Sequence, residues 1–273
     1  MLRVYWNSFK FLGRTVRRSL GKFTRECPLC SYKGKFLGYG YPYTCDILCP
    51  KCGSLERHRL LALANREHDF FRDREILHFA PETAIRKLAV GHSPRSYTTA
   101  DLFAAGVDRK ENIEALTIGD GSLDLVICLH VLEHVNDRRA AGELFRVLRP
   151  GGILLAMFPI VEGWDETYED TSRTTPEERL LYFGQHDHVR FFGRDARMRL
   201  AATGFIVEEY TALEPNVSRY GLARGEKVFI CSRPPAYRAM PAENGARDET
   251  ITPLFTGGHP ETEAPATVLS AAS

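Results

Sequence analysis

The sequence predicts an α/β protein in which a mainly parallel sheet carries helices on both faces and follows a small cysteine-rich ribbon. Three observations support this prediction. A strand, a helix and another strand alternate over residues 122–158, short apolar segments typical of strands recur on both sides of that unit, and two Cys-x-x-C pairs precede it. Strands that alternate with helices indicate parallel pairing, because a parallel crossover needs a connection of helical length.

The two ends of the chain have unusual compositions. Residues 1–25 hold seven basic and no acidic side chains. Such a segment suits a membrane surface, a nucleic acid, a transit peptide or, more simply, an extension that packs on the domain. Residues 234–273 are rich in proline, alanine, glycine and threonine, which predicts a disordered tail. The formal net charge of +1 gives no case for a polyanionic partner, and no apolar run is long enough to span a membrane.

Two cysteine pairs, Cys27 with Cys30 and Cys49 with Cys52, have eighteen residues between them. Each pair can place two thiolates on one tight turn, and two such turns surround a zinc ion tetrahedrally. The alternatives are two disulfides or four unrelated thiols, and Cys45 could replace Cys49 as a ligand. A zinc ion with four cysteine ligands has no open position, so we expect a structural zinc ribbon in a cytoplasmic protein.

A helix over residues 54–74 is expected to connect the ribbon, at residues 26–53, to the main domain. Ser54 is its predicted N-cap, because a serine hydroxyl can accept from the free N–H groups of a first helical turn. Strands are predicted next at Glu75–Phe79 and Tyr97–Ala100, since both segments are short and rich in apolar or β-branched residues.

The segment Leu125–Leu129 is an unbroken apolar run, typical of a strand that is covered on both faces. A helix capped by Asn136 or Asp137 follows, and a proline and two glycines end it before the next strand. Ionisable side chains gather directly after the first strand, at the edge where open α/β sheets bind ligands. These side chains are His130, Glu133 and His134.

The series in this unit, an apolar strand, a Glu-His pair, a helix and Arg-x-Leu-x-Pro-Gly-Gly, resembles class I S-adenosylmethionine-dependent methyltransferases of the type 11 group. The resemblance extends over about residues 76–233. It implies a Rossmann-like seven-stranded sheet within a domain at residues 75–233, with the last strand antiparallel, and S-adenosylmethionine as the cofactor. The last two strands are then predicted at Phe205–Tyr210 and Lys227–Cys231.

The turn after the first strand, residues 78–82, departs from the pattern of these enzymes, which carry an acidic residue and glycines there. Ala80 replaces the first glycine, since a methyl group is the smallest side chain that could stand between the backbone and the cofactor. His78 replaces the acid, and Glu82 replaces a later glycine. Two interpretations remain open. Either His78 or Glu82 contacts the methionine group of the cofactor, or the turn is degenerate and the domain only scaffolds.

The other cofactor positions agree better with the resemblance. Asp101 follows the second strand, where a carboxylate can accept from both ribose hydroxyls, and an ordinary turn aspartate is the alternative. Asn112 replaces the acid that contacts the adenine amino group, and Ile113 packs on the ring. Leu129, at the end of its strand, completes the predicted contacts to the cofactor.

Methyl transfer from a sulfonium needs an aligned nucleophile and a base for its proton, because the leaving group requires no protonation. The candidate catalytic residues are His130, Glu133 and His134, with His130 favoured because it directly follows the strand. A structural role is the alternative for each. The polar stretch Trp164–Glu178 and the run at 185–190 predict a lid that forms the substrate wall. The predicted substrate contacts are Tyr168, His186, His188 and Arg190, the last for an acidic group.

These features together predict a methyltransferase that acts on an oxygen or nitrogen nucleophile. The acceptor stays open between a small molecule or saccharide and RNA, with which the basic N-terminus is compatible. The alternative from another class is a non-catalytic zinc-ribbon adaptor, whose degenerate Rossmann domain binds a partner protein. Cofactor or product bound to the purified protein would distinguish the enzyme from the adaptor.

Overall fold

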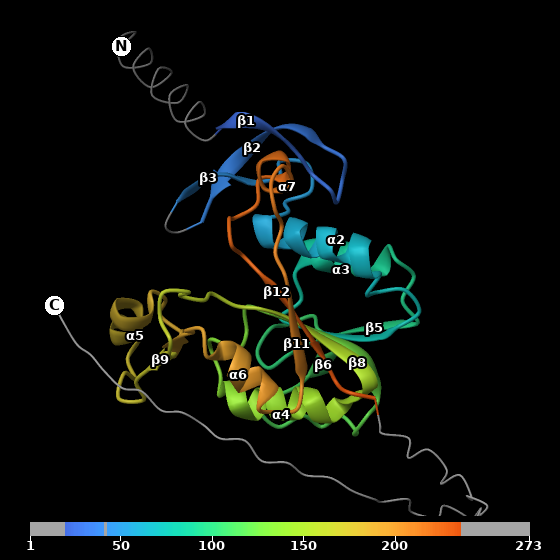
Figure 1. Ribbon diagram of the computed structural model, residues 1–273, viewed down its shortest axis with the longest axis vertical. Coiled ribbons are helices and arrows are strands. Elements are labelled where there is room, and N and C mark those ends of the chain that lie inside the picture. Colours follow the sequence, from blue (N-terminus) through green and yellow to red (C-terminus); the bar gives the residue numbers. More distant parts are fainter. Residues whose placement is uncertain (1–19, 41–42, 236–273) are drawn as a thin grey trace, which may run out of the picture. The chain divides into compact units, whose positions relative to one another are not determined.

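The computed structural model describes residues 20–40 and 43–235 (Figure 1). Most of the predicted tail and most of the predicted basic extension therefore lie outside the described residues. Within the described part of the chain, none of the helices combines the length and the apolar character that a membrane span requires.

A three-stranded antiparallel sheet opens the described chain. Its strands, in their order of pairing, are β1 (Leu20–Glu26), β2 (Lys33–Tyr39) and β3 (Thr44–Leu48). Residues 20–25, predicted as part of the extension, thus belong to this sheet, because their backbone pairs with β2, for example Thr24 with Lys35. Helix α7 (Asn216–Tyr220), from the far end of the main domain, contacts β1.

Helix α2 (Glu56–His68) has Leu55 as its N-cap and not the predicted Ser54. The Leu55 N–H donates to His58 Nδ1 at 3.0 Å, so a histidine ring takes part in satisfying the free N–H groups of the helix start. The Ser54 side chain is fully buried, and its Oγ lies 3.3 Å from Cys27 Sγ and 3.2 Å from Cys52 Sγ. Ser54 therefore supports the cysteine cluster instead of capping the helix.

The buried Arg59 side chain of α2 joins the small sheet to the main domain. Its Nη1 donates to the carbonyl of Ile47 in β3 at 2.9 Å and to that of Ser54 at 2.7 Å. Its Nε and Nη2 donate to the carbonyls of Tyr220 and Gly221, both at 2.7 Å. One guanidinium thus holds together three segments that are distant in the sequence.

The main sheet has seven strands in the order β11-β12-β8-β7-β4-β5-β6. The neighbours from β8 to β6 are parallel, and β12 is antiparallel to both β8 and β11. This confirms the predicted fold class, including the antiparallel last strand. The strands are β4 (Glu75–Phe79), β5 (Ser96–Asp101), β6 (Arg109–Lys110), β7 (Leu123–Leu129), β8 (Leu148–Met157), β11 (Ile206–Tyr210) and β12 (Val228–Ser232).

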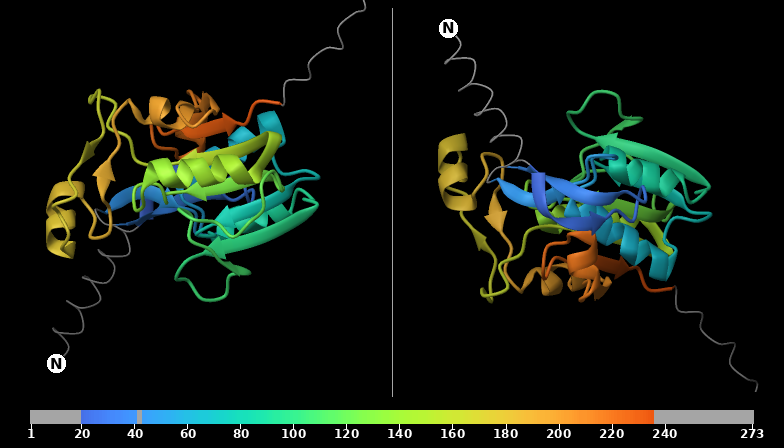
Figure 2. Two further views of the ribbon diagram at one scale, coloured as in Figure 1. Left: turned by 90° about the horizontal axis from the view of Figure 1, so that it is seen from below. Right: turned by 90° about the horizontal axis from the view of Figure 1, so that it is seen from above.

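Helices cover both faces of the main sheet, as Figure 1 and Figure 2 show. Helices α4 (Asp137–Val147) and α6 (Ala196–Ala201) share one apolar cluster with Val126 of β7. Helices α2 and α3 (Thr83–Val90) share the other cluster with Leu125. Successive residues of β7 therefore enter different cores, which explains why this strand is apolar without alternation.

Helix α4 begins at the predicted cap, since Asn136 Oδ1 accepts from the Arg139 N–H at 3.1 Å. The predicted lid segment, between β8 and α6, has regular structure of its own. It contains β9 (Tyr168–Glu169), α5 (Pro176–Phe183) and β10 (Arg190–Phe191), and β9 pairs with β10 antiparallel. The lid segment therefore packs as a small unit beside the sheet edge.

Candidate functional site

The residues that follow β4, β7 and β8 surround a cavity of ≈ 360 Å³. Parallel strands place the residues after their carboxyl ends side by side, so the cavity lies at the predicted edge of the sheet. Seven predicted site residues line it, namely Ala80, Glu82, Leu129, His130, Glu133, His134 and His188. The other lining residues are Arg57, Pro159 and Gln185.

Two of the lining residues, Ala80 and His130, have left-handed backbone conformations with φ of 46° and 53°. Ala80 directly follows β4, and His130 directly follows β7. Non-glycine residues adopt this conformation only where the surrounding structure holds them, which is frequent at functional sites. The positive φ of Ala80 also explains why a glycine is expected at this position, because glycine adopts positive φ without strain. Alanine is the smallest residue that can replace it.

Two side chains from α2 hold the Glu82 carboxylate. Arg57 Nε lies 3.2 Å from Glu82 Oε1 and 3.4 Å from Oε2, and His58 Nε2 lies 2.8 Å from Oε1. Burial alone would raise the pKa of Glu82, but the hydrogen bonds from His58 and Arg57 outweigh it and lower the pKa to about 2. The cavity therefore presents a guanidinium and an ionised carboxylate next to each other.

His78 does not line the cavity, in contrast to the prediction. Its side chain is fully buried, and its Nδ1 lies 2.6 Å from Tyr97 Oη. Its neighbours Leu77 and Phe79 point into the apolar cluster under α4, so His78 lies on the opposite face, toward α2. Burial, with a contribution from His58, lowers the pKa of His78 to about 4. His78 is thus a neutral core residue outside the lining of this cavity.

The stability of the protein should depend on pH through His78. His78 takes up a proton near pH 4 in the folded chain and near pH 6.5 in the unfolded chain. Because folding favours the neutral ring, the contribution of His78 to the free energy of unfolding is complete above pH 6.5 and is lost as the pH falls to 4. The loss amounts to about 3 kcal/mol. Urea unfolding at stepped pH should therefore show a steeper decline for the wild type than for His78→Asn, which keeps a polar atom near Tyr97 but does not titrate. Equal declines would contradict the assignment.

Asp101 is the last residue of β5, and Asn112 lies two residues after β6; these are the two strands beyond β4 in the sheet. Asp101 Oδ1 accepts from the N–H groups two and three residues later, both at 2.7 Å, as a turn aspartate does. Asn112 is exposed, its Oδ1 accepts from the Glu114 N–H at 3.0 Å, and Ile113 is buried. These predicted cofactor residues do not line the cavity after β4 but continue the same edge away from it.

Glu133, His134 and His188 form a cluster. Each offers one oxygen or nitrogen atom that could ligate a metal, and these three atoms lie within 4.8 Å of one another. His130 stands beside it, with its Nδ1 3.2 Å from Glu133 Oε1. Glu133 is buried, whereas 32% of the His130 side chain is exposed. Burial lowers the pKa of His188, against the opposing effect of the Glu133 carboxylate. The three predicted catalytic residues therefore do lie together, and His188 of the lid segment joins them.

Arg190, predicted to bind an acidic substrate group, is buried and already paired. Its Nε lies 3.2 Å from Glu169 Oε2, its Nη2 lies 3.4 Å from Asp137 Oδ1, and its Nη1 donates to the Leu132 carbonyl at 2.8 Å. The guanidinium thus fastens the lid segment to the loop after β7. Arg190 does not line the cavity, and its guanidinium is paired within the protein.

Two further predicted substrate contacts, Tyr168 and His186, also lie outside the cavity lining. The Tyr168 ring packs near the rings of Trp164 and Phe183, with centroids at 6.4 and 5.6 Å. His186 is exposed on a turn. Both residues belong to the predicted lid segment, but His188 and Gln185 are the side chains that this segment contributes to the cavity.

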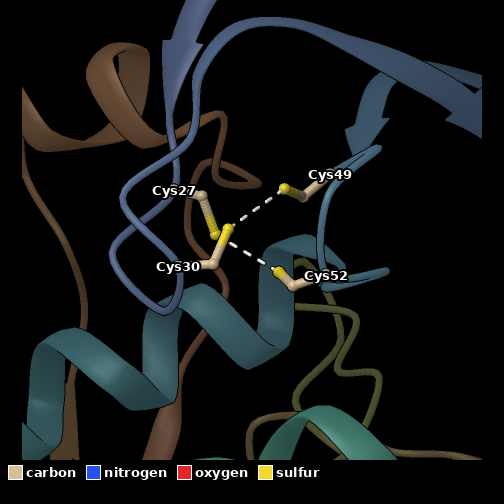
Figure 3. Close-up of side chains that lie close together, drawn as sticks. All are labelled: Cys27, Cys30, Cys49 and Cys52. Atoms are coloured by element: carbon tan, nitrogen blue, oxygen red, sulfur yellow. Dashed lines mark hydrogen bonds between the residues drawn. The ribbon is translucent and has the colours of Figure 1, made fainter.

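The four predicted zinc ligands converge in the small sheet (Figure 3). Cys27 Sγ lies 3.6 Å from Cys52 Sγ, and Cys30 Sγ lies 3.7 Å from Cys49 Sγ. Four sulfur atoms at about 2.3 Å from one zinc ion lie about 3.8 Å apart, so the cluster fits this ion. Cys45 is exposed and does not belong to the cluster.

Residues 74–156 match the family model of the methyltransferase domain. A protein of Mycolicibacterium smegmatis with the name "Probable S-adenosylmethionine-dependent methyltransferase" is 37% identical over 71 residues, which cover 26% of this chain and 25% of that protein. Residues 74–156 of this chain are therefore similar to methyltransferase domains. The chain matches only about a quarter of the length of this curated relative.

Solved structures similar to this chain include two from bacteria. An S-adenosylmethionine-dependent methyltransferase of Mesorhizobium loti is 18% identical, with 64% of this chain and 97% of that chain covered and a TM-score of 0.45. The 1,6-didemethyltoxoflavin-N1-methyltransferase of Burkholderia thailandensis is 14% identical, with 64% and 76% covered and a TM-score of 0.45. The fold assignment depends on the strand order of this chain itself.

Two charged residues at or near the cavity were not among the predicted site residues. Arg57 lines the cavity, but its partner Glu82 is 25 residues away, so no local pattern marks it. Glu226 precedes β12, and burial together with Glu56 raises its pKa to about 7, while His130 opposes this. No signal in the sequence distinguishes Glu226 from an ordinary turn glutamate.

Proposed function

We propose that this protein transfers a methyl group from S-adenosylmethionine to an oxygen or nitrogen atom of an acceptor. The cavity after β4 and β7 carries the proposal, because it combines the left-handed Ala80 with the paired charges of Arg57 and Glu82. The methionine end of the cofactor carries a carboxylate and an ammonium group. A guanidinium and a carboxylate complement these two groups through charge-assisted hydrogen bonds.

The remaining cofactor contacts follow the edge of the sheet. With its methionine group near Ala80 and Leu129, the cofactor would extend past Asp101 to Asn112 and Ile113, since β5 and β6 lie in this order beyond β4. Asp101 then accepts from ribose hydroxyls. Asn112 accepts from the adenine amino group, and the apolar Ile113 packs on the ring.

His130 is the proposed base for the proton of the acceptor. Its Nδ1 faces Glu133 Oε1, which favours the tautomer with the proton on Nδ1. Within the described part of the chain, His130 Nε2 has no hydrogen-bond partner, so it is free to accept a proton. The volume of ≈ 360 Å³ suits a small molecule or one saccharide unit, because small-molecule pockets measure about 300–1,000 Å³.

The first test is a calorimetric titration of S-adenosylhomocysteine into the purified full-length protein. We expect micromolar binding that weakens at least tenfold in Asp101→Asn. Asparagine keeps the oxygen that accepts from the turn N–H groups but removes the charge that would hold the ribose hydroxyls. Asp69→Asn, at the end of α2, is the control with the same chemical change away from the sheet edge.

Two outcomes of this titration would count against the proposal. If the folded wild type bound no S-adenosylhomocysteine, the non-catalytic adaptor would become the better explanation, with the altered turn at residues 78–82 as its cause. If Asp101→Asn bound S-adenosylhomocysteine as tightly as the wild type, the proposed contact between Asp101 and the ribose hydroxyls would be wrong.

We also propose that Cys27, Cys30, Cys49 and Cys52 hold a structural zinc ion. The cluster supports this through its sulfur spacing and through the Ser54 hydroxyl, which contacts two of the sulfur atoms. The proposed organisation is then a zinc ribbon at residues 20–53, the connecting helix α2 and a methyltransferase domain at residues 75–233. Four thiolates in one cluster agree with a reducing, cytoplasmic environment.

A further inference from the structure

We propose that Glu133, His134 and His188 bind a divalent transition-metal ion in the wall of the cavity. The three residues come from the loop after β7 and from the lid segment, and one ligand atom of each lies within 4.8 Å of the other two. The Val189 N–H donates to the Glu133 carbonyl at 3.0 Å, so the backbone holds these two segments together. The fold therefore positions the three side chains before any ion binds.

Two atoms of this cluster are buried without a partner. Glu133 and His188 are only 2% and 7% exposed, and no residue in the described ranges hydrogen-bonds Glu133 Oε2 or His188 Nδ1. A buried polar atom without a partner costs about 1–3 kcal/mol. A metal ion would satisfy both atoms, because a carboxylate oxygen and a neutral imidazole nitrogen are electron-pair donors.

The surroundings of His134 resemble those of histidines that bind metals. Its Nδ1 lies 3.3 Å from Asp187 Oδ2 and 3.3 Å from the Asp187 carbonyl, and Gln185 Nε2 donates to the other carboxylate oxygen at 3.0 Å. A carboxylate or carbonyl behind one ring nitrogen orients an imidazole and makes the other nitrogen a better ligand. The ring of His188 stands edge-on to that of His134, with centroids 4.7 Å apart.

Zinc, iron, cobalt and manganese ions are all bound by ligand sets of two imidazoles and one carboxylate. Ligand atoms at about 2.1 Å from one ion lie about 3 Å apart, so small rotations of the side chains would close the cluster around it. The site differs from the cysteine cluster, whose four thiolates leave no open position. Three protein ligands leave positions open toward the cavity.

An ion at this place would face the acceptor. An acceptor oxygen bound to it would lose its proton more readily, beside His130 as the base. This role rests on the proposed function, whereas binding of the ion does not. Metal binding is therefore measured directly, without turnover.

The test uses the full-length protein with zinc in the cysteine cluster and Co²⁺ as the probe. Calorimetry measures its affinity, and visible absorption distinguishes the two sites, since only cobalt bound to thiolates shows sulfur-to-metal charge transfer. We expect one additional Co²⁺ per chain without that charge-transfer band. Glu133→Gln and His188→Gln should each weaken its binding at least tenfold. His186→Gln, in the same run but exposed, should leave it unchanged.

Three results would overturn the proposal. The first is no uptake of Co²⁺ beyond the zinc, and the second is equal uptake by the wild type and Glu133→Gln. The third is that His186→Gln loses as much Co²⁺ affinity as Glu133→Gln, which would indicate adventitious binding by surface histidines. Titration of S-adenosylhomocysteine into the same proteins separates the two proposals. Variants that still bind it have an intact cavity, and a wild type that binds Co²⁺ but not S-adenosylhomocysteine would contradict only the proposed function.

Discussion

Replacing Arg59 by alanine is expected to lower the free energy of unfolding by about 4 kcal/mol, because the change leaves several buried carbonyl oxygens without a donor. The Arg59 side chain is fully buried and donates four hydrogen bonds to backbone carbonyls, at 2.7 to 2.9 Å. Its guanidinium also lies 4.6 Å from the centroid of the Phe36 ring. Chemical denaturation followed by circular dichroism measures the loss.

Arg66→Ala is the matched control for this experiment. Arg66 is on the same helix and also donates to the ribbon, to the Pro28 carbonyl at 2.9 Å, but this contact is exposed. Its removal should cost less than about 1 kcal/mol. Arg59→Lys should recover only part of the stability, since an ammonium group cannot reproduce the planar fork of donors. A loss below 1 kcal/mol in Arg59→Ala would show that the carbonyls find other donors.

Replacing Cys49 by serine is expected to abolish zinc binding and to unfold the segment from Cys27 to Cys52. Cys49 is fully buried in the cluster, and a structural zinc ion contributes on the order of 10 kcal/mol to the folding of a small cysteine-ligated unit. Removal of zinc by a chelator should have the same effect. Limited proteolysis should then cut first within this segment, before the domain that contains the seven-stranded sheet.

Cys45→Ser controls for the loss of a thiol from the same segment, because Cys45 is exposed and lies outside the cluster. This variant should keep its zinc content and its proteolysis pattern. An unchanged pattern after chelation, with zinc shown to be absent by elemental analysis, would mean that the small sheet holds together without the ion.

Much of the fold could be predicted because its signals are local. The apolar run at Leu125–Leu129, the cap at Asn136 and the spacing of the cysteines each depend on residues close in the sequence. The seven strands and the antiparallel last strand follow from the resemblance to methyltransferases, and the parallel pairing follows from the alternation of strands with helices. The edge that carries the site was therefore predictable, as was the presence of Glu133 and His134 there.

The structure departs most from the predictions at side chains whose partners are distant in the sequence. Ser54 was expected to cap a helix, but the cysteine thiols use its hydroxyl. His78 was assigned to the cofactor, because the sequence does not show which face of β4 is turned toward α2. Arg190 was assigned to the substrate, although Glu169 and Asp137 neutralise it. Local pattern determines the backbone well, but the roles of charged side chains are decided by tertiary contacts.

The contact between Glu82 and helix α2 has a consequence for regulation. Arg57 and His58 lie in the first turn of α2, shortly after Cys52 and Ser54, so the proposed zinc cluster and the turn at residues 78–82 are both connected to the same few residues. Free-energy coupling between two sites is reciprocal. If the zinc-loaded ribbon raises the affinity for cofactor by some factor, bound cofactor raises the affinity for zinc by the same factor. Under the proposed function, loss of zinc would then lower methyl transfer gradually, and a high concentration of cofactor would delay that loss.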